Sequence, residues 1–423
     1  MKVKNMNISI PYGFKKINLY IKKNINFDEL NINTINSIPE FSIVKNALKT
    51  PTGSLSLSEF VQKGDKIAIV VSDYTRNTRS AFYLPFIISE LKKLGIRLSD
   101  ITIVIALGLH KPATKSEISK IVGEKLSKLI KIENHNPDSN LIKLGTISLN
   151  KNVACSSKII ITGAVTFHPL AGFSGGFKSL LPGVASREDI IANHMLYFNG
   201  LIPNPKVGPG YIRGNPILYD MFRLSNVLKN VYCFNVVLGK NHKIIYASSG
   251  SIQESWRSCV KFIKKYFILN IEKPYKFLIA SAGGFPNDFS FYQSMKVLTN
   301  ASRACIPGGT ILILSECSRG WGIRPELLKL FSMPLEEIAK YLKMEFSIDG
   351  LSIYMASRII KNFNVIFYSS LDAEEVKRNG MMPMNDSEDL QNLINNYTSD
   401  TFAILPEATL ILPKSCKEKN NKA

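Results

Sequence analysis

The sequence predicts an α/β protein built from two doubly wound domains with a cleft between them. Continuous apolar runs of six or seven residues alternate with amphipathic segments of helix length, a pattern typical of parallel sheets covered by helices on both faces. The alternation pauses at IEKPYK (271–276) and then starts again. We therefore expect a first domain over residues 1–272 and a second over residues 273–404, with the tail of about 405–423 a candidate to return to the first domain.

The composition is that of a globular chain. Of its 423 residues 45% are hydrophobic and 20% are charged, close to the usual averages, which excludes disorder, collagen and coiled coil as the main class. The longest apolar runs, at 66–71 and 101–109, are far shorter than the ~20 residues that span a bilayer. The first residues also lack the apolar stretch of a secretory signal. We expect a cytoplasmic protein with no membrane partner.

The charge distribution and the cysteine spacing argue against further classes of protein. Lys and Arg number 53 against 33 acidic residues, a net charge of +20, but the excess is spread along the chain, whereas a nucleic-acid footprint is concentrated on one face. We expect no nucleic-acid partner, and a non-enzymatic basic binding protein remains an alternative.

The six cysteines include no C-x-x-C pair, so we expect buried, reduced thiols and neither a disulfide framework nor a thiolate zinc site.

The elements of the first domain follow from local patterns. Residues 1–62 contain short strand-like runs and loops without a repeat. The segment at 114–130 opens on a Thr-x-x-Glu capping box. The expected strands lie at 66–73, 101–110 and 158–165, the helices at 81–95, 114–130, 186–198 and 252–267, and a hairpin over 232–250 turns at 239–242.

The second domain repeats the alternation of strands and helices. Its expected strands lie at 277–284, 308–317, 364–370 and 401–412, and its helices at 291–305, 334–344 and 387–397.

In parallel sheets of this kind, ligands bind beyond the carboxyl ends of the strands. Polar residues follow several strands at this edge: Asp73 and Arg76 in SDYTR, His110 in GLHKP, the glycine-rich segment after 158–165, and Ser281–Gly284.

The glycine-rich segment HPLAGFSGGFKSLLPG (168–183) is the richest of these. Gly175 and Gly176 permit backbone N–H groups to converge on an anion, and Lys178 adds a charge beside them. The phosphate-loop pattern G-x-x-x-x-G-K-[ST] fails, because Phe177 stands where its last glycine belongs. A nucleotide transferase or hydrolase is therefore a weaker alternative. A flexible glycine turn before a helix is the structural alternative.

Three of the five histidines, His110, His168 and His194, lie in or near the strand ends of the first domain. Such a group indicates proton transfer, metal binding or both. His194 at helical spacing also fits a core residue, and His110 an exposed loop residue. His135 and His242 receive no role. No H-E-x-x-H spacing occurs, so a conventional hydrolytic zinc site is not supported.

Together these residues resemble the nickel-pincer-nucleotide-dependent lactate racemases and their 2-hydroxyacid racemase and epimerase relatives, over essentially the whole chain. The spacing of His168, Lys178 and His194 is the most specific part of the resemblance. The segments that carry it are SDYTR (72–76), GLH (108–110), 168–183, Asn193–His194 and FYQSMK (291–296).

The resemblance implies a cofactor site. Lys178 resembles the lysine that carries pyridinium-3-thioamide-5-thiocarboxylic acid mononucleotide covalently, and His194 resembles the single protein ligand to nickel. Gly175 and Gly176 would hold the phosphate of the mononucleotide. Asp73 would belong to the same cofactor-binding group, with no specified role. One imidazole with soft sulfur donors suits nickel better than zinc.

The resemblance also implies a reaction. His110 and His168 look like paired general bases, and Arg76, Gln293 and Lys296 like the substrate-binding residues. The implied activity is racemisation of a 2-hydroxyacid, most simply lactate, by reversible hydride transfer, which avoids a carbanion beside a carboxylate. Malate or a sugar acid stays open, because Arg79 adds a positive charge after SDYTR. The implied partners are the small hydroxyacid and the proteins that mature the cofactor.

Overall fold

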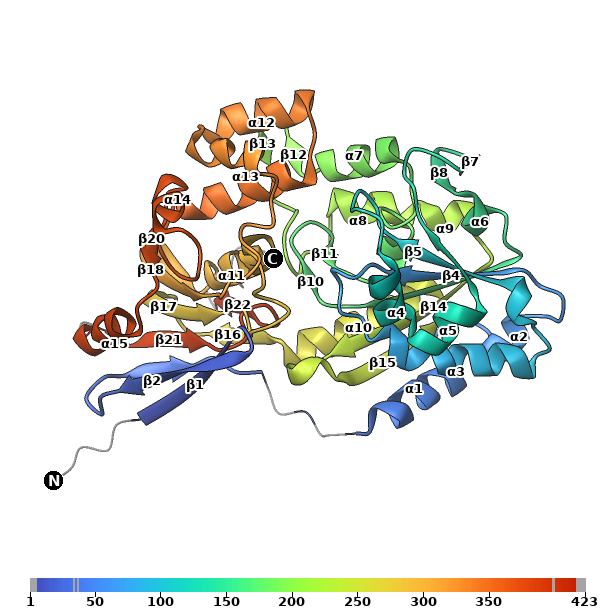
Figure 1. The fold of residues 1–423 in the computed structure, drawn as a ribbon, viewed down its shortest axis with the longest axis horizontal. Helices are drawn as coiled ribbons and strands as arrows, with labels where there is room; N and C mark the ends of the chain where they lie inside the picture. The colour runs from blue at the N-terminus through green and yellow to red at the C-terminus, as the bar shows by residue number, and fades with distance from the viewer. Residues whose placement is uncertain (1–5, 33–34, 36–37, 398–399, 416–423) are drawn as a thin grey trace. The chain divides into compact units, whose positions relative to one another are not determined.

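A computed structural model describes residues 6–32, 35, 38–397 and 400–415 of the chain. The chain divides into two compact units, one over Thr34–Lys265 and the other over Met1–Asn33 together with Tyr266–Ala423. Each unit contains a six-stranded sheet with helices around it (Figure 1). The predicted α/β class with two domains is confirmed.

The sheet of the Thr34–Lys265 unit is parallel except for one edge strand, β15, which forms the predicted hairpin with β14. Strand β4 lies between β5 and β9, so the chain order reverses there. The strands in order across the sheet are β15 (Ile244–Gly250), β14 (Val231–Leu238), β9 (Lys158–Ala164), β4 (Ile67–Ser72), β5 (Ile101–Ala106) and β6 (Lys131–Asn134). Three small hairpins are β7 (Leu141–Leu144) with β8 (Ile147–Asn150), β10 (Phe167–His168) with β11 (Gly172–Phe173), and β12 (Phe198–Asn199) with β13 (Ile202–Pro203).

The helices of this unit match most of the predicted segments. The Thr114 capping box is present, and Gly123, with a φ of +90°, divides the expected 114–130 helix into α4 and α5. Helix α1 was not predicted, since residues 1–62 were expected to hold only strands and loops. The helices are α1 (Glu40–Lys49), α2 (Leu57–Phe60), α3 (Ser80–Lys93), α4 (Lys115–Val122), α5 (Glu124–Leu129), α6 (Lys151–Ala154), α7 (Arg187–Met195), α8 (Pro216–Phe222), α9 (Leu224–Val227) and α10 (Ile252–Tyr266), with 3-10 turns η1 (Leu98–Asp100), η2 (Gly176–Ser179) and η3 (Lys240–His242).

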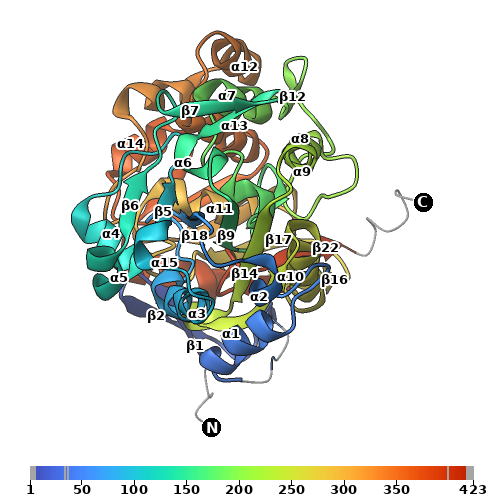
Figure 2. The same ribbon diagram turned by 90° about the vertical axis from the view of Figure 1, so that its right-hand side faces the viewer.

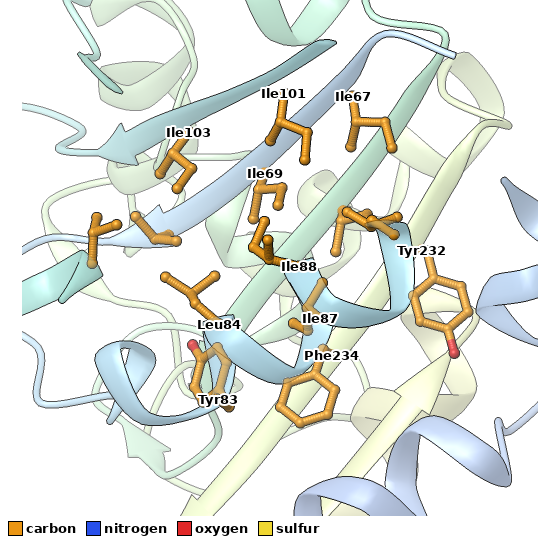
Figure 3. Close-up of a cluster of buried hydrophobic side chains, with 14 of the residues drawn as sticks. Ile67, Ile69, Tyr83, Leu84, Ile87, Ile88, Ile101, Ile103, Tyr232 and Phe234 are labelled. Carbon is orange, nitrogen blue, oxygen red and sulfur yellow. The ribbon is translucent and has the colours of Figure 1, made fainter. Parts of the chain in front are cut away.

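The core of this unit explains why α3 covers the sheet. Leu84, Ile87 and Ile88 of α3 pack on isoleucines of β4 and β5, among them Ile69 and Ile103 (Figure 3). Helix α1 packs beside α3, as two views show (Figures 1 and 2). Every residue from Ile67 to Val71 is buried, so this central strand is covered on both faces, as its continuous apolar run predicted.

The sheet of the other unit is parallel throughout. Its strands in order are β20 (Met382–Met384), β19 (Asn364–Tyr368), β18 (Cys305–Leu314), β17 (Tyr275–Ser281), β21 (Phe402–Leu405) and β3 (Phe27–Glu29). The helices are α11 (Phe291–Ala301), α12 (Leu335–Met344), α13 (Ile348–Ile360), α14 (Ala373–Arg378) and α15 (Ser387–Asn396), with the 3-10 segment η4 (Pro325–Ser332). Helix α13 was not predicted because it is apolar on most sides, so no amphipathic pattern marks it.

The domain boundary differs from the expected one. Strand β3 pairs with β21, and the hairpin of β1 (Met6–Tyr12) and β2 (Lys15–Ile21) buries Ile10 and Leu19 in the same core as Phe277. In Figure 1 this blue hairpin lies below the orange and red strands of that unit. Strand β22 (Leu412–Ser415) pairs with β16 (Ile268–Ile271). Both strands belong to the unit of Met1–Asn33 and Tyr266–Ala423, so the described tail stays within that unit. Residues 416–423 lie outside the described part of the chain.

The described residues also test the expectations about membrane-spanning helices and about the cysteines. No helix in this part of the chain is long and apolar enough to cross a membrane. The described cysteines are free thiols, and Cys233, Cys259, Cys305 and Cys317 are buried as expected. Cys155 is exposed, contrary to the expectation, because it follows the short surface helix α6. Cys416 lies outside the described residues.

A buried carboxyl group attaches the N-terminal hairpin to its unit. Asp288 is fully buried, and its Oδ2 accepts hydrogen bonds from the Gly13 N–H at 2.6 Å and the Glu316 N–H at 3.4 Å. Burial raises the pKa of Asp288, although these N–H groups oppose the rise. The carbonyl of Gly13 in turn accepts from the Phe285 N–H at 2.9 Å.

We expect Asp288→Ala to destabilise the protein by about 1–3 kcal/mol, because it leaves buried N–H groups unpaired. Asp288→Asn keeps an acceptor oxygen without burying a charge, and should stay within about 1 kcal/mol of the wild type. Urea unfolding measures both. Equal losses in the two variants would show that the Gly13 contact is not what the carboxyl group supplies.

Candidate active site

The candidate site lies at the carboxyl edge of the sheet in the Thr34–Lys265 unit. Asp73 follows β4, His110 follows β5, and the segment that holds His168 and Lys178 follows β9. Since β4 lies between the other two strands, their loops emerge side by side where the chain order reverses, the usual position of a ligand site in such sheets. The Gly108 N–H donates to the Gly183 carbonyl at 3.0 Å, which joins the His110 loop to the Lys178 segment.

Asp73 is buried and forms a hydrogen bond with Nδ1 of His110. Thr75 Oγ1 donates to the other oxygen of Asp73 at 2.8 Å. Burial would raise the pKa of Asp73, but the hydrogen bond and charge of His110, with Arg76 nearby, lower it. An ionised carboxylate only accepts hydrogen bonds, so His110 carries its proton on Nδ1 and directs a lone pair from Nε2. Asp73, whose role the sequence left open, therefore orients His110.

The two arginines that follow β4 differ in their surroundings. Arg76 is half-buried, and its backbone N–H donates to the Asp73 carbonyl at 3.1 Å, which closes the turn after the strand. Arg79 pairs with Glu40 of α1, with Nη2 and Oε2 2.9 Å apart, and lies over the ring of Phe82. The charge of Arg79 is thus neutralised within the fold, and it does not argue for a more acidic substrate.

His168 is buried in the small β10–β11 hairpin. Its Nδ1 accepts hydrogen bonds from the N–H groups of Leu170 at 3.2 Å and Ala171 at 3.1 Å. Pro169 has no N–H, so these are the first two donors after the histidine. With Nδ1 occupied as an acceptor, the neutral ring of His168 carries its proton on Nε2.

Lys178 lies in the single 3-10 turn η2, two residues after a pair of glycines with positive φ, Gly175 at +73° and Gly176 at +53°. A Cβ at Gly175 would lie 2.7 Å from Val165 Cγ2, and one at Gly176 would lie 2.9 Å from Trp256 Cδ1. These glycines therefore permit close packing under the lysine. The turn is fixed by contacts on both sides, contrary to the flexible turn considered from the sequence.

Asn235 was missed by the sequence interpretation. Its buried Oδ1 accepts from the Gly176 N–H at 3.1 Å, and its Nδ2 donates to Ser255 Oγ at 3.0 Å. Ser255 Oγ donates in turn to the Ser248 carbonyl at 3.1 Å. The Gly176 N–H is therefore already bonded, which argues against its predicted use for a phosphate. The sequence does contain a signal for this residue, since Asn235 is a polar amide inside the apolar run VYCFNVVL. A buried amide requires hydrogen-bond partners, so a structural role for Asn235 could have been expected.

His194 lies near the end of α7, the predicted helix, whose N-cap is Ser186. Its Nδ1–H donates to the Ile190 carbonyl at 2.8 Å, so Nε2 presents a lone pair. Burial, followed by the charge of Lys178, lowers the pKa of His194 to about 4. The charge of His110 acts in the same direction. The structure thus brings Lys178, His194 and His110 within electrostatic reach of one another.

A neutral imidazole whose Nδ1–H is held by a carbonyl is the usual form of a metal-ligating histidine. Within the described residues no three His, Cys, Asp or Glu side chains gather as a metal site. Asn193 fixes this part of α7, because its Nδ2 donates to Asp220 of α8 at 2.8 Å.

The remaining candidate residues are Gln293 and Lys296, which lie in the other unit on the first turns of α11, three residues apart and half-buried. That spacing places them on one side of the helix. Their predicted contact with substrate stays a prediction. His135, which received no role, is buried and donates from Nε2 to the Ala185 carbonyl at 2.9 Å.

Comparisons with known proteins give consistent results. The family models described as the lactate racemase N-terminal and C-terminal domains match residues 12–202 and 271–406. The chain is 30% identical to the lactate racemase of Thermoanaerobacterium thermosaccharolyticum over 96% of this chain and 99% of that protein. It is 30% identical to the lactate racemase of Lactiplantibacillus plantarum over 79% of this chain and 81% of that one.

Solved structures show the same likeness. The lactate racemase apoprotein from Thermoanaerobacterium thermosaccharolyticum superposes with a TM-score of 0.85 at 30% identity, covering 97% of this chain and 100% of that one. A protein from Thermotoga maritima shares the fold, with a TM-score of 0.65 at 17% identity over 89% of this chain and 98% of that one.

We expect Asn235→Leu to lower the free energy of unfolding by about 1–3 kcal/mol, because it leaves the buried Gly176 N–H without an acceptor. Asn226→Leu, at an exposed position of α9, is the matched control and should change stability by less than about 0.5 kcal/mol. Urea unfolding followed by tryptophan fluorescence compares them. Similar losses in both variants would contradict the role of Asn235.

We expect the chain without metal or cofactor to lose stability as the pH falls from about 6.5 to about 4, because over this range the unfolded chain protonates His194 and the folded chain does not. The loss assigned to this group is on the order of 3 kcal/mol. Urea unfolding at several pH values should show a weaker acid dependence in His194→Gln than in the wild type. His242→Gln, in the hairpin turn, is the control, and an unchanged dependence in both variants would contradict the assignment.

Proposed function

The chain belongs to the lactate racemase family, and from this premise we propose that it interconverts the two enantiomers of a 2-hydroxyacid, with lactate the first substrate to test. Its named relatives are racemases, so its enzyme class is that of an isomerase. The observation that carries the proposal is the grouping of an Asp73–His110 pair with Lys178 and His194 at the carboxyl edge of one sheet.

The residues present fit the cofactor that the family implies. Lys178 would hold a nickel-pincer nucleotide covalently, and His194, neutral at ordinary pH with Nδ1–H already bonded, would be the protein ligand to nickel. When bound, this group supplies the acceptor for the hydride on C2 of the substrate. Gly175 remains a proposed neighbour of its phosphate, whereas the Gly176 N–H is bonded to Asn235.

Residues of the chain itself transfer the hydroxyl proton of the substrate and bind its carboxylate. His110, held by Asp73, takes the proton of the substrate hydroxyl at Nε2, and the Asp73 carboxylate stabilises the imidazolium that forms. Arg76 binds the planar substrate carboxylate, for which a guanidinium offers two parallel donors. His168 is the second histidine at the substrate oxygen, and Gln293 and Lys296 are proposed to bind substrate from the other unit.

No observation favours the phosphate-loop alternative. Phe177 is buried against Phe222, with ring centroids 5.2 Å apart, so it is part of the core under the turn. Because Gly176 donates to Asn235, the turn also lacks the run of converging N–H groups that a phosphate loop uses. Maturation proteins that build and attach the cofactor remain proposed partners.

We expect Lys178→Ala to abolish racemisation and the mass added to the chain when it is produced together with the maturation proteins. Intact-mass spectrometry and nickel analysis measure attachment, and the conversion of one lactate enantiomer to the other measures activity. Lys264→Ala, on α10, is the control. An active Lys178→Ala protein would rule out covalent attachment at this residue.

We expect Asp73→Asn to lower kcat by about 10²–10⁴ while the cofactor mass and nickel content stay at the wild-type level, because an amide can donate to Nδ1 of His110 and so favour the wrong tautomer. Asp138→Asn is the matched control, since Asp138 is a surface carboxylate paired with Arg187. Wild-type turnover in Asp73→Asn would show that the carboxylate does not orient the base.

A further inference from the structure

The loop that carries His110 becomes exposed directly after the histidine. The His110 N–H donates to the Leu107 carbonyl at 2.9 Å, which closes a turn, and the next two residues, Lys111 and Pro112, are exposed. Ala113 is the first buried residue after them. The way in which the chain is held at Ala113 therefore limits how far the His110 loop can move.

One side chain, Asn134 at the end of β6, binds both polar groups of the Ala113 backbone. The Ala113 N–H donates to Asn134 Oδ1 at 3.1 Å, and Asn134 Nδ2 donates to the Ala113 carbonyl at 3.0 Å. Because the amide accepts one bond and donates the other, its orientation is fixed. The pairing of β5 with β6 ends at Ile105 and Asn134, so this amide extends the hydrogen bonding of the sheet to the loop beyond β5.

The residue after Asn134 anchors this end of β6 on two sides. The backbone N–H of His135 donates to the Ile105 carbonyl at 3.2 Å, and its Nε2–H donates to the Ala185 carbonyl at 2.9 Å. Ala185 lies between the Lys178 turn and α7. The amide of Asn134 therefore projects from backbone that is bonded both to the central sheet and to the Lys178 segment.

The other contacts of the loop act on the part before Lys111. The Gly108 N–H donates to the Gly183 carbonyl at 3.0 Å, and Nδ1 of His110 bonds to Asp73. The bonds to Asn134 restrain the part that follows. Without them the exposed residues after His110 would be free to pull the imidazole away from its carboxylate partner. A displacement of about 1 Å in a reacting group can cost on the order of 10²-fold in rate.

We infer that Asn134 is a positioning residue for racemisation: its amide fixes Ala113 and thereby keeps His110 in place beside Asp73. The inference rests on the proposed function, in which His110 exchanges a proton with the substrate. Asn134 acts on the base through the loop backbone, whereas Arg76, proposed to bind the substrate carboxylate, follows a different strand, β4. Loss of the amide should therefore lower kcat far more than it changes KM.

Asn230 provides a matched control. Its Nδ2 donates to the carbonyls of Ser156 at 3.0 Å and Ser157 at 2.9 Å, so this half-buried amide also makes two hydrogen bonds to backbone. These bonds lie at the amino edge of the same sheet, since Asn230 directly precedes β14 and Ser157 directly precedes β9. An activity loss that reflects a weakened fold alone should therefore be as large in Asn230→Ala as in Asn134→Ala.

The first test uses the full-length chain and needs no cofactor. Amide hydrogen exchange followed by NMR, corrected for intrinsic rates, should show the Ala113 N–H exchanging at least about tenfold more slowly than the Lys111 N–H in the wild type. Asn134→Ala should abolish this protection, and Asn230→Ala should keep it. Equal exchange at the two positions in the wild type would overturn the inference, and this measurement does not depend on whether a variant folds.

The second test uses the matured protein. Asn134→Ala should lower kcat by about 10–10²-fold and change KM by less than about threefold, with cofactor mass and nickel content at the wild-type level. Asn230→Ala should keep the wild-type kcat. Equal kcat losses in the two variants would show that Asn134 supports the fold alone and would overturn the inference. A wild-type protein that racemises no hydroxyacid would overturn the proposed function, whereas slow exchange at Ala113 would still support the Asn134 contact.

Discussion

The position of β4 between β5 and β9 is the constraint on which the site depends. Each parallel strand delivers its carboxyl end to the same edge, and the reversal of chain order at β4 places the loops that follow β9, β4 and β5 next to one another at that edge. Asp73 and His110 come from two of these strands and the Lys178 segment from the third. Their proximity therefore requires no contact that is local in sequence. It follows from strand pairing, which the apolar cores on both faces of the sheet stabilise.

The hydrogen-bond partners that the fold supplies also select the tautomers of the histidines. His110 faces a carboxylate, His194 a helix carbonyl and His168 two peptide N–H groups, and each partner selects one tautomer. A free histidine has no such selection, so the chemical differences among these three side chains are set by their neighbours. Burial adds to this effect, because it disfavours a charge on His194 beside the Lys178 ammonium.

Much of the fold could be predicted from the sequence, and part of the site could as well. Runs such as Ile67–Val71 and the Thr114 capping box are local signals, and they gave the strands, most helices and the edge at which Asp73, His110 and Lys178 lie. The attachment of the N-terminal hairpin could not be predicted, because the pairing of β3 with β21 joins segments at opposite ends of the chain. The role of Asp73 was hidden for a similar reason, since its partner His110 follows a different strand, β5.

The buried amide of Asn235 shows why the glycine segment was misleading as a motif. Read alone, Gly175 and Gly176 suggest free N–H groups and a mobile turn. In the fold, Asn235 and Trp256 occupy the space that side chains at these positions would need, and the Gly176 N–H is satisfied within the protein. A lysine placed on such a turn loses little further freedom when its end is constrained, because the backbone beneath it is already fixed. The two glycines therefore help to position Lys178 because they allow close packing beneath it. The anion-binding interpretation of the same sequence assumed a turn with unbonded N–H groups, which differs from the turn observed.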